Sequence, residues 1–351
     1  MTWHRPSLAE AFAITAVPVA QDTNSERFIS HYPPWKLGTE LPIPPPAFGA
    51  FGGTVYGQAA LAAARAHEKR VSIESDKDAR MGIFSIQGVF TRPAIQDRPF
   101  VHDVTPIQNG RSFAAYLTST RQSTQPSSIP KGPFSVSDAN LPLNEPCFTC
   151  ITTMGRPRES QVSFQQPVSA QQMYHSILSQ RAPDQWDSCP QLDLEPTVQL
   201  FPNAGHGAFP ILDMYKVDMT EFNKDKPYTD RRELLFYRPH KPIAQDDPNA
   251  HITAHAYASD RNGLLMLANH VGFARSFKKA ATLSYSFYVH SNASEAVMDD
   301  KGWWLLEFRW TRADAERCIM ETKIWSPDGK HIASGYQDGV LSAHDTTKVK
   351  L

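Results

Sequence analysis

Hydrophobic and polar positions along the first half of the chain predict one long helix followed by several strands. Residues 54–69 are rich in alanine and contain no proline, which favours a helix. The small side chains suit a helix that closely approaches a curved sheet. Apolar and polar residues then alternate, as is typical of strands, at residues 81–90, 99–108, 111–121 and 148–154. Asn109-Gly110 predicts a tight hairpin turn between the second and third of these strands.

The second half of the chain repeats this order of elements. A helical pattern covers residues 250–269, and strand patterns lie on both sides of it. The strands are expected near residues 198–201, 214–217, 282–290, 303–312, 315–325 and 331–341. One helix followed by antiparallel strands is an α+β pattern, so its repetition predicts that one fold has been duplicated.

Further segments complete the predicted division of the chain. Ser7 can cap a short helix, two strands are expected at residues 14–19 and 26–32, and a proline-rich run at residues 41–46 breaks regular structure. We therefore expect three parts, which are an N-terminal domain at residues 1–156, a helical connector at residues 157–195 and a C-terminal domain at residues 196–351.

Length and charge set limits on function. The 351 residues are enough for roughly two domains that each bury a core. With 35 basic and 36 acidic residues the formal net charge is −1, so no field over the whole chain favours nucleic acid, and any recognition of an anion must be local. No stretch reaches the roughly 20 apolar residues that a membrane-spanning helix needs.

Cysteine and histidine spacing gives no support for a metal or redox site. Four cysteines in a chain of this length are too few for a disulfide framework and suit a reducing compartment. Cys147 and Cys150 lie in an alternating strand pattern, and no second Cys/His pair follows at metal-ligand spacing. His251 and His255 are four residues apart but lack the glutamate of the zincin motif, which favours a packing role. We expect neither a metal nor an organic cofactor.

Five short segments, found in a fixed order along the chain, resemble one known family. They are Phe51-Gly-Gly-Thr-Val-Tyr-Gly-Gln58, Phe90-Thr-Arg-Pro93, Gly110-Arg-Ser-Phe113, Tyr257-Ala-Ser-Asp260 and Ser334-Gly-Tyr-Gln-Asp-Gly339. The ordered set resembles the TesB-type acyl-CoA thioesterases, the acyl-CoA thioesterase II group. This resemblance implies a tandem, or double, hotdog fold of the α+β class, in which two antiparallel sheets each wrap a central helix.

The same resemblance assigns candidate catalytic residues. The family uses an Asp after Ala-Ser, a Thr or Ser that begins the following central strand, and a Gln near the C-terminus. In this chain these positions are Asp260, Thr282 and Gln337. Thioester hydrolysis needs a water aimed at the carbonyl, a group that takes its proton, and donors for the developing oxyanion. The resemblance therefore implies that these three side chains hold the attacking water, and that backbone N–H groups at a helix N-terminus hold the oxyanion.

Two departures from the family pattern keep other functions open. Ser284-Tyr-Ser286 stands where the family commonly has Asp-His-Ser, and Arg261-Asn-Gly-Leu264 replaces a more usual Phe-Leu pair after Asp260. These changes allow a specialised acyl chain, such as that of a secondary metabolite. They also leave two rivals, which are a binding module that holds an acyl-thioester without hydrolysing it and an isomerase or cyclase that uses the same pocket.

The expected partner is an acyl-CoA. Arg65, Lys69, Arg92 and Arg111 are available to CoA phosphates, although surface solvation is the default role of each. Hotdog domains form their sites in pairs, so one chain can act as a pseudo-dimer and can associate further as a homo-oligomer. The expected location is intracellular, in the cytosol or the peroxisome, because Val349-Lys-Leu351 matches the Ser-Lys-Leu signal in its last two residues.

Overall fold

The first half of the chain forms a sheet around one long helix. The computed structural model describes residues 4–19, 24–36, 41, 49–73, 80–202 and 209–344. The elements up to residue 155 are α1 (Leu8–Ala11), β1 (Ile14–Val17), β2 (Glu26–Ser30), α2 (Gly52–Ile73), β3 (Gly82–Phe90), β4 (Phe100–Asn109), β5 (Phe113–Gln122), η1 (Val136–Asn140) and β6 (Phe148–Gly155). Ser7 caps α1 as predicted, because its hydroxyl accepts a hydrogen bond from the Glu10 N–H.

The second half repeats the arrangement with a shorter central helix. Short elements come first, namely α3 (Ala170–Met173), α4 (His175–Leu178), η2 (Pro183–Gln185), β7 (Asp187–Ser188), α5 (Glu195–Leu200), β8 (Leu212–Lys216), α6 (Thr220–Asn223), η3 (Tyr228–Asp230) and β9 (Glu233–Pro239). The remaining elements are α7 (Pro248–Ser259), α8 (Gly263–His270), β10 (Phe277–Val289), η4 (Ala293–Ala296), β11 (Trp304–Asp314), β12 (Arg317–Trp325) and β13 (His331–Ala343).

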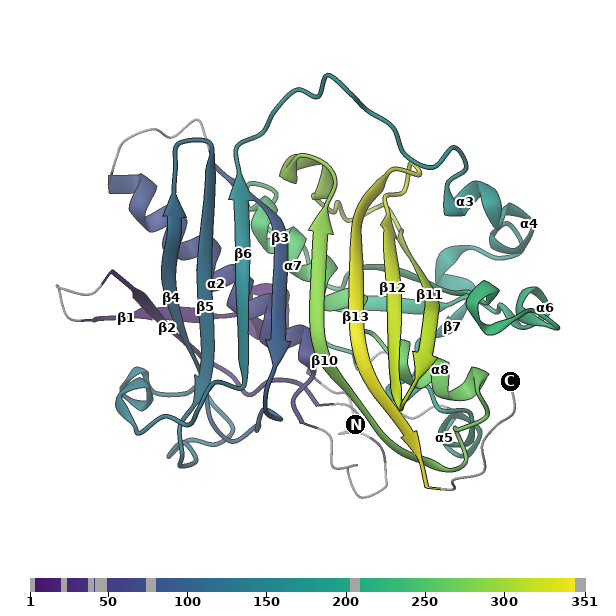
Figure 1. Ribbon diagram of the computed structural model, residues 1–351, viewed down its shortest axis with the longest axis horizontal. Coiled ribbons are helices and arrows are strands. Elements are labelled where there is room, and N and C mark those ends of the chain that lie inside the picture. Colours follow the sequence, from purple (N-terminus) through teal and green to yellow (C-terminus); the bar gives the residue numbers. More distant parts are fainter. Residues whose placement is uncertain are drawn as a thin grey trace.

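The sheets of the two halves join edge to edge. Antiparallel pairing between β3 and β10 produces one 13-stranded sheet with the order β1-β2-β4-β5-β6-β3-β10-β13-β12-β11-β9-β8-β7. Figure 1 shows this sheet running across the molecule, with α2 and α7 side by side against one of its faces. The two predicted sheets are therefore continuous, and the central helices meet beside the β3–β10 junction.

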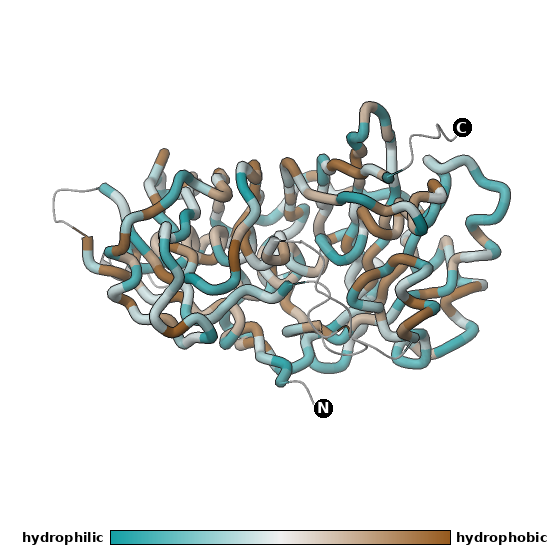
Figure 2. Tube along the Cα trace, turned by 90° about the horizontal axis from the view of Figure 1, so that it is seen from below, coloured by the Kyte–Doolittle hydropathy of each residue, from teal (hydrophilic) through white to brown (hydrophobic). Residues whose placement is uncertain are grey.

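Small side chains allow the central helices to pack closely. Tyr56 of α2 donates a hydrogen bond of 2.9 Å from its hydroxyl to the Ala256 carbonyl of α7, so one side chain of α2 contacts the backbone of α7 directly. In Figure 2 hydrophilic segments gather along the outer loops, and hydrophobic stretches run through both halves. The alanines that the sequence singled out in α2 are all 0% exposed, namely Ala59, Ala60, Ala62, Ala63, Ala64 and Ala66.

Several sequence predictions were wrong in the second half. The strand expected at residues 198–201 is part of helix α5, and strand β9 was not predicted. The helix expected over residues 250–269 is two helices, because Asn262 adopts a left-handed backbone with φ of 59° between them. Most of the proline-rich run, apart from Leu41, and residues 349–351 lie outside the described residues.

The cysteines and histidines that the sequence analysis weighed as metal or redox candidates are part of the packed core. Burial raises the pKa of the Cys147 and Cys150 thiols to about 12, so neither is a ready thiolate. His251 hydrogen-bonds the Ala244 carbonyl and the Met298 N–H, and His255 hydrogen-bonds the Tyr237 hydroxyl and the Ala296 carbonyl. Among the residues that the structure describes, every helix is too short or too polar to span a bilayer.

Candidate active site

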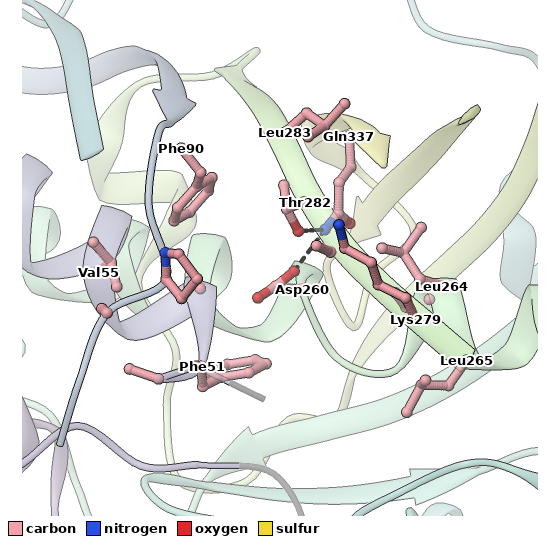
Figure 3. Close-up of a pocket in the computed structure, with 18 of the residues that line it drawn as sticks. Phe51, Val55, Phe90, Asp260, Leu264, Leu265, Lys279, Thr282, Leu283 and Gln337 are labelled. Atoms are coloured by element: carbon pink, nitrogen blue, oxygen red, sulfur yellow. Dashed lines mark hydrogen bonds between the residues drawn. The ribbon is translucent and has the colours of Figure 1, made fainter. Parts of the chain in front are cut away.

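Asp260, Thr282 and Gln337 lie together at one point in the second half of the chain. The Gln337 amide nitrogen donates to the Asp260 carboxylate over 2.8 Å and also hydrogen-bonds the Thr282 hydroxyl. Figure 3 shows these two contacts, with the Asp260 carboxylate pointing into the adjoining space. Three side chains that are up to 77 residues apart in the sequence are therefore joined through one amide.

Each of the three comes from a different element. Asp260 follows the last residue of α7, where the chain turns sharply toward α8. Thr282 lies on β10 and Gln337 on β13, two strands that pair directly. Gln337 is 3% exposed, and its Oε1 atom has no hydrogen-bond partner among the described residues. The Oε1 atom is itself buried, so the amide nitrogen is the part of Gln337 that acts at the site.

The start of helix α2 brings the first half of the chain into this site. The Gly53 N–H donates to the second carboxylate oxygen of Asp260 over 2.8 Å. A Cβ atom at Gly53 would lie 2.6 Å from the Phe51 ring and 2.9 Å from the Tyr257 carbonyl oxygen, so glycine is required for this approach. The positive end of the α2 dipole therefore faces a carboxylate supplied by the other half.

The surroundings of Asp260 set its protonation near neutrality. Burial of the carboxylate raises its pKa from 3.8 to about 7, although the hydrogen bonds from Gly53 and Gln337 and the charge of Arg261 act in the opposite direction. A carboxylate with this pKa can take up and release a proton at neutral pH, which is what general acid–base catalysis requires.

A cavity of about 610 Å³ adjoins the three side chains. Asp260, Thr282 and Gln337 all line it, together with residues from both halves of the chain. In Figure 3, Phe51, Val55 and Phe90 form one apolar side, and Leu264 and Leu265 lie on the other side of Asp260. A volume of this size, apolar with few polar groups, is typical of a small-molecule site.

Two β-bulges on β10 shape the wall of this cavity. The pairing of β10 with β13 shifts between Phe277 and Lys279 and again between Thr282 and Ser284, which leaves Lys278 and Leu283 as extra residues. The whole stretch of β10 from Phe277 to Leu283, which includes both bulges, lines the cavity.

The departure at Ser284-Tyr-Ser286 places a tyrosine behind the site. Tyr285 is 2% exposed, and its hydroxyl hydrogen-bonds the Ser259 hydroxyl over 2.7 Å. Its ring stacks on Tyr56 of the first half, with centroids 3.9 Å apart. Tyr285 therefore supports the residue that precedes Asp260 and fills the junction between the two halves.

In the departure at Arg261-Asn-Gly-Leu264, Asn262, Gly263 and Leu264 line the cavity, whereas Arg261 does not. Its guanidinium is buried, donates to the Pro190 carbonyl over 2.6 Å and lies 4.2 Å from the Phe209 ring centroid. Leu264 lines the cavity as expected from its position in the sequence. Sequence reasoning did not assign Gly53 a role in the site, although the Gly52-Gly53 pair at the helix start is the signal that could have indicated it.

Comparisons with known proteins establish the family of this chain. A family model for the acyl-CoA thioesterase N-terminal domain matches residues 39–135, and a model for the acyl-CoA thioesterase C-terminal domain matches residues 187–341. The two models lie in the same order as the two halves and together match more than two thirds of the chain. The chain belongs to the acyl-CoA thioesterase family. The predicted activity, hydrolysis of an acyl-CoA thioester, is confirmed at this level, and the rival functions are not favoured.

Solved structures confirm the predicted double hotdog fold. Acyl-CoA thioesterase II from Mycobacterium marinum aligns with a TM-score of 0.60 at 18% identity, covering 97% of this chain and 98% of the other. A hot dog fold protein from Alicyclobacillus acidocaldarius gives 0.59 at 14% identity, covering 96% and 98%. A tesB protein of Mycobacterium avium subspecies paratuberculosis gives 0.57 at 15% identity, covering 95% and 98%. A comparison with curated proteins gave no match.

Proposed function

We propose that this acyl-CoA thioesterase hydrolyses its substrate with a water held by Asp260, Thr282 and Gln337. The observation that carries the proposal is the Gln337 amide, which hydrogen-bonds both other side chains at the edge of the cavity. The groups left over are the remaining lone pairs of the Asp260 carboxylate and the Thr282 hydroxyl hydrogen, and Gln337 holds the water through these two side chains, which it positions. They suit a water molecule, which both donates and accepts.

Asp260 is the only acid–base group that the proposed reaction needs. Asp260 takes a proton from the water while the water oxygen bonds to the thioester carbonyl carbon. The carbon–sulfur bond then breaks, and the proton passes from Asp260 to the thiolate of CoA. The products are a free acid and CoA, and the carboxylate returns to its starting form without a covalent intermediate.

Helix α2 supports this reaction electrostatically. Negative charge develops on the thioester oxygen as the water attacks, and donors aimed at that oxygen lower the barrier. The first turn of α2 lies next to Asp260, as the Gly53 hydrogen bond shows. We therefore propose that the first turn of α2 stabilises the oxyanion, which identifies the helix that the sequence left unassigned.

Substitution at Asp260 tests the mechanism. Thiol release from a panel of acyl-CoAs, short to long, is measured for the wild type and for Asp260→Ala. Loss of the base should lower kcat by about a hundredfold or more. Equal activity of the two proteins would refute the assignment of Asp260, and a wild type without turnover on any acyl-CoA would point to a more specialised thioester or to a binding role.

Two matched substitutions at Thr282 test whether its hydroxyl or its branched shape is needed for activity. Thr282→Val keeps the branched side chain and removes the hydroxyl, whereas Thr282→Ser keeps the hydroxyl. We expect Val to lower kcat and Ser to retain most of it, because the hydroxyl is the group that contacts Gln337. Similar losses in both variants would instead indicate a packing role for Thr282.

The division at residues 1–156, 157–195 and 196–351 remains a proposal, as do the homo-oligomer and the intracellular location.

The sequence supports the intracellular location through its cysteine content and its terminal Lys-Leu. Imaging a fluorescent fusion with and without the last three residues would separate peroxisome from cytosol, because a peroxisomal signal is lost on removal.

A further inference from the structure

Three positively charged side chains border the cavity that Asp260 also borders. Among the lining residues, Arg92, Lys278 and Lys279 carry positive charge, and Asp260 carries the negative charge. Arg92 follows strand β3 of the first half, whereas both lysines begin strand β10 of the second half. All three side chains are exposed. The cations therefore lie at the solvent side of the cavity and come from both halves.

These three cations have no acidic partner in the part of the chain that the structure describes, so their charge is not neutralised within the protein. By contrast, Arg65 pairs with Asp247, and Lys69 pairs with Glu26 over 2.7 Å. Arg65 and Lys69 are thus used within the protein, while the cavity cations are available to a ligand.

The two lysines lie at a β-bulge of strand β10. Lys278 has no paired residue on β13, since Phe277 pairs with Ala343 and Lys279 pairs with Ser342. Both lysines line the cavity and concentrate positive charge there, in a chain whose net charge is −1.

An acyl-CoA carries its thioester and its phosphates at opposite ends of one arm. Its thioester must reach Asp260, and its phosphates lie at the far end of the pantetheine arm. Ammonium and guanidinium groups are the usual partners of phosphate oxygens.

We propose that Arg92, Lys278 and Lys279 bind the phosphates of coenzyme A at the rim of the cavity. The proposal rests on the acyl-CoA thioesterase function given above, and it assigns the phosphate end of the substrate to named residues. Both halves of the chain would then contribute residues to the phosphate site. Both halves also contribute to the site of the reacting thioester, through the Gly53–Asp260 contact.

Calorimetric titration with coenzyme A tests the proposal without requiring turnover. The double variant Lys278→Glu, Lys279→Glu should raise the Kd of coenzyme A about tenfold or more, because two charge-assisted contacts become repulsive. A matched control, Lys224→Glu with Lys301→Glu, makes the same change of charge at exposed lysines outside the cavity lining and should bind like the wild type. Thermal melting checks that both variants fold.

A substrate without phosphates supplies the second readout. For butanoyl-CoA the cavity variant should show a raised KM and an unchanged kcat, whereas kcat/KM for S-butanoylpantetheine should match the wild type. The phosphate assignment would be overturned if the cavity variant kept the wild-type affinity for coenzyme A, or if it lost equal activity with both substrates. A wild type that does not bind coenzyme A would overturn it as well. A wild type that binds coenzyme A, is weakened by the cavity substitutions and hydrolyses nothing would support the phosphate site while refuting the proposed hydrolysis.

Discussion

Asp260 is the residue whose surroundings do most to explain the proposed chemistry. Two donors, the Gly53 N–H and the Gln337 amide, favour its charged form, while burial opposes that form more strongly. The resulting pKa of about 7 makes the carboxylate a far better proton acceptor than an ordinary aspartate. Burial by both halves of the molecule, rather than any neighbouring acid, accounts for this shift.

The activity should depend on pH through this carboxylate. Because the charged form is the base, kcat/KM for an acyl-CoA should rise as pH increases through about 7 and then level off. A series of initial rates in buffers of constant ionic strength checks this expectation. A profile that stays flat from about pH 6 to 8 would show that Asp260 does not titrate as the base in this range.

The same pKa predicts a cost in stability. The folded pKa of about 7 is above the value of 3.8, so Asp260 destabilises the fold as pH rises between these values. Asp260→Asn removes the charge with little change in shape, although its single amide oxygen accepts only one of the hydrogen bonds from Gly53 and Gln337. Relative to the wild type, we expect the unfolding free energy of the variant to be about 1–2 kcal/mol higher near pH 8 than below about pH 4, because only the charged carboxylate is penalised by burial. Urea unfolding at both pH values measures the difference, and a gain independent of pH would contradict this explanation.

At the scale of elements, the start of α2 is the part with the least tolerance for change. Gly53→Ala would place a methyl group 2.9 Å from the Tyr257 carbonyl oxygen and so displace the helix start from Asp260. We expect kcat to fall about tenfold to a hundredfold, since small displacements of positioned groups carry large penalties. Acyl-CoA hydrolysis measures the effect.

Gly335→Ala is the matched control for Gly53→Ala. A Cβ atom at Gly335 would lie 3.6 Å from its nearest neighbours, the Ser259 and Tyr285 hydroxyls, which is ordinary contact. This variant should keep most of its activity although it is also close to the site. Equal losses at Gly53 and Gly335 would show that the region is generally sensitive and that the α2 contact has no special role.

At the scale of the whole molecule, the two central helices use their N-termini differently. The α2 start faces the Asp260 carboxylate, whereas the α7 start is capped by Asp247, whose carboxylate accepts from the Ala250 N–H over 3.1 Å. Asp247 also pairs with Arg65 of α2. The N-terminus of α2 therefore faces a carboxylate at the cavity, whereas the residue that caps α7 forms an ion pair between the two halves.

Substitution at Asp247 should therefore affect stability and leave catalysis intact. Asp247→Ala removes a helix cap and a cross-domain ion pair, with an expected loss of about 1–2 kcal/mol in unfolding free energy. Asp247→Asn keeps a capping side chain and should lose about half as much. Urea unfolding gives both values. Because Asp247 does not line the cavity, a large fall in kcat in a folded variant would be unexpected.

The sequence by itself determined the duplicated α+β plan, the alanine-rich helix and most strands, because their periodicity and propensity are local properties. The ordered motifs also indicated the family and the types of the three site residues. Only the tertiary structure decided that β3 pairs with β10, that Gly53 reaches Asp260 and that β10 carries bulges at Lys278 and Leu283 beside the cavity. The β3–β10 pairing and the Gly53–Asp260 contact join residues about 200 positions apart, and the pKa of Asp260 depends on burial by both halves, so no local pattern encodes them.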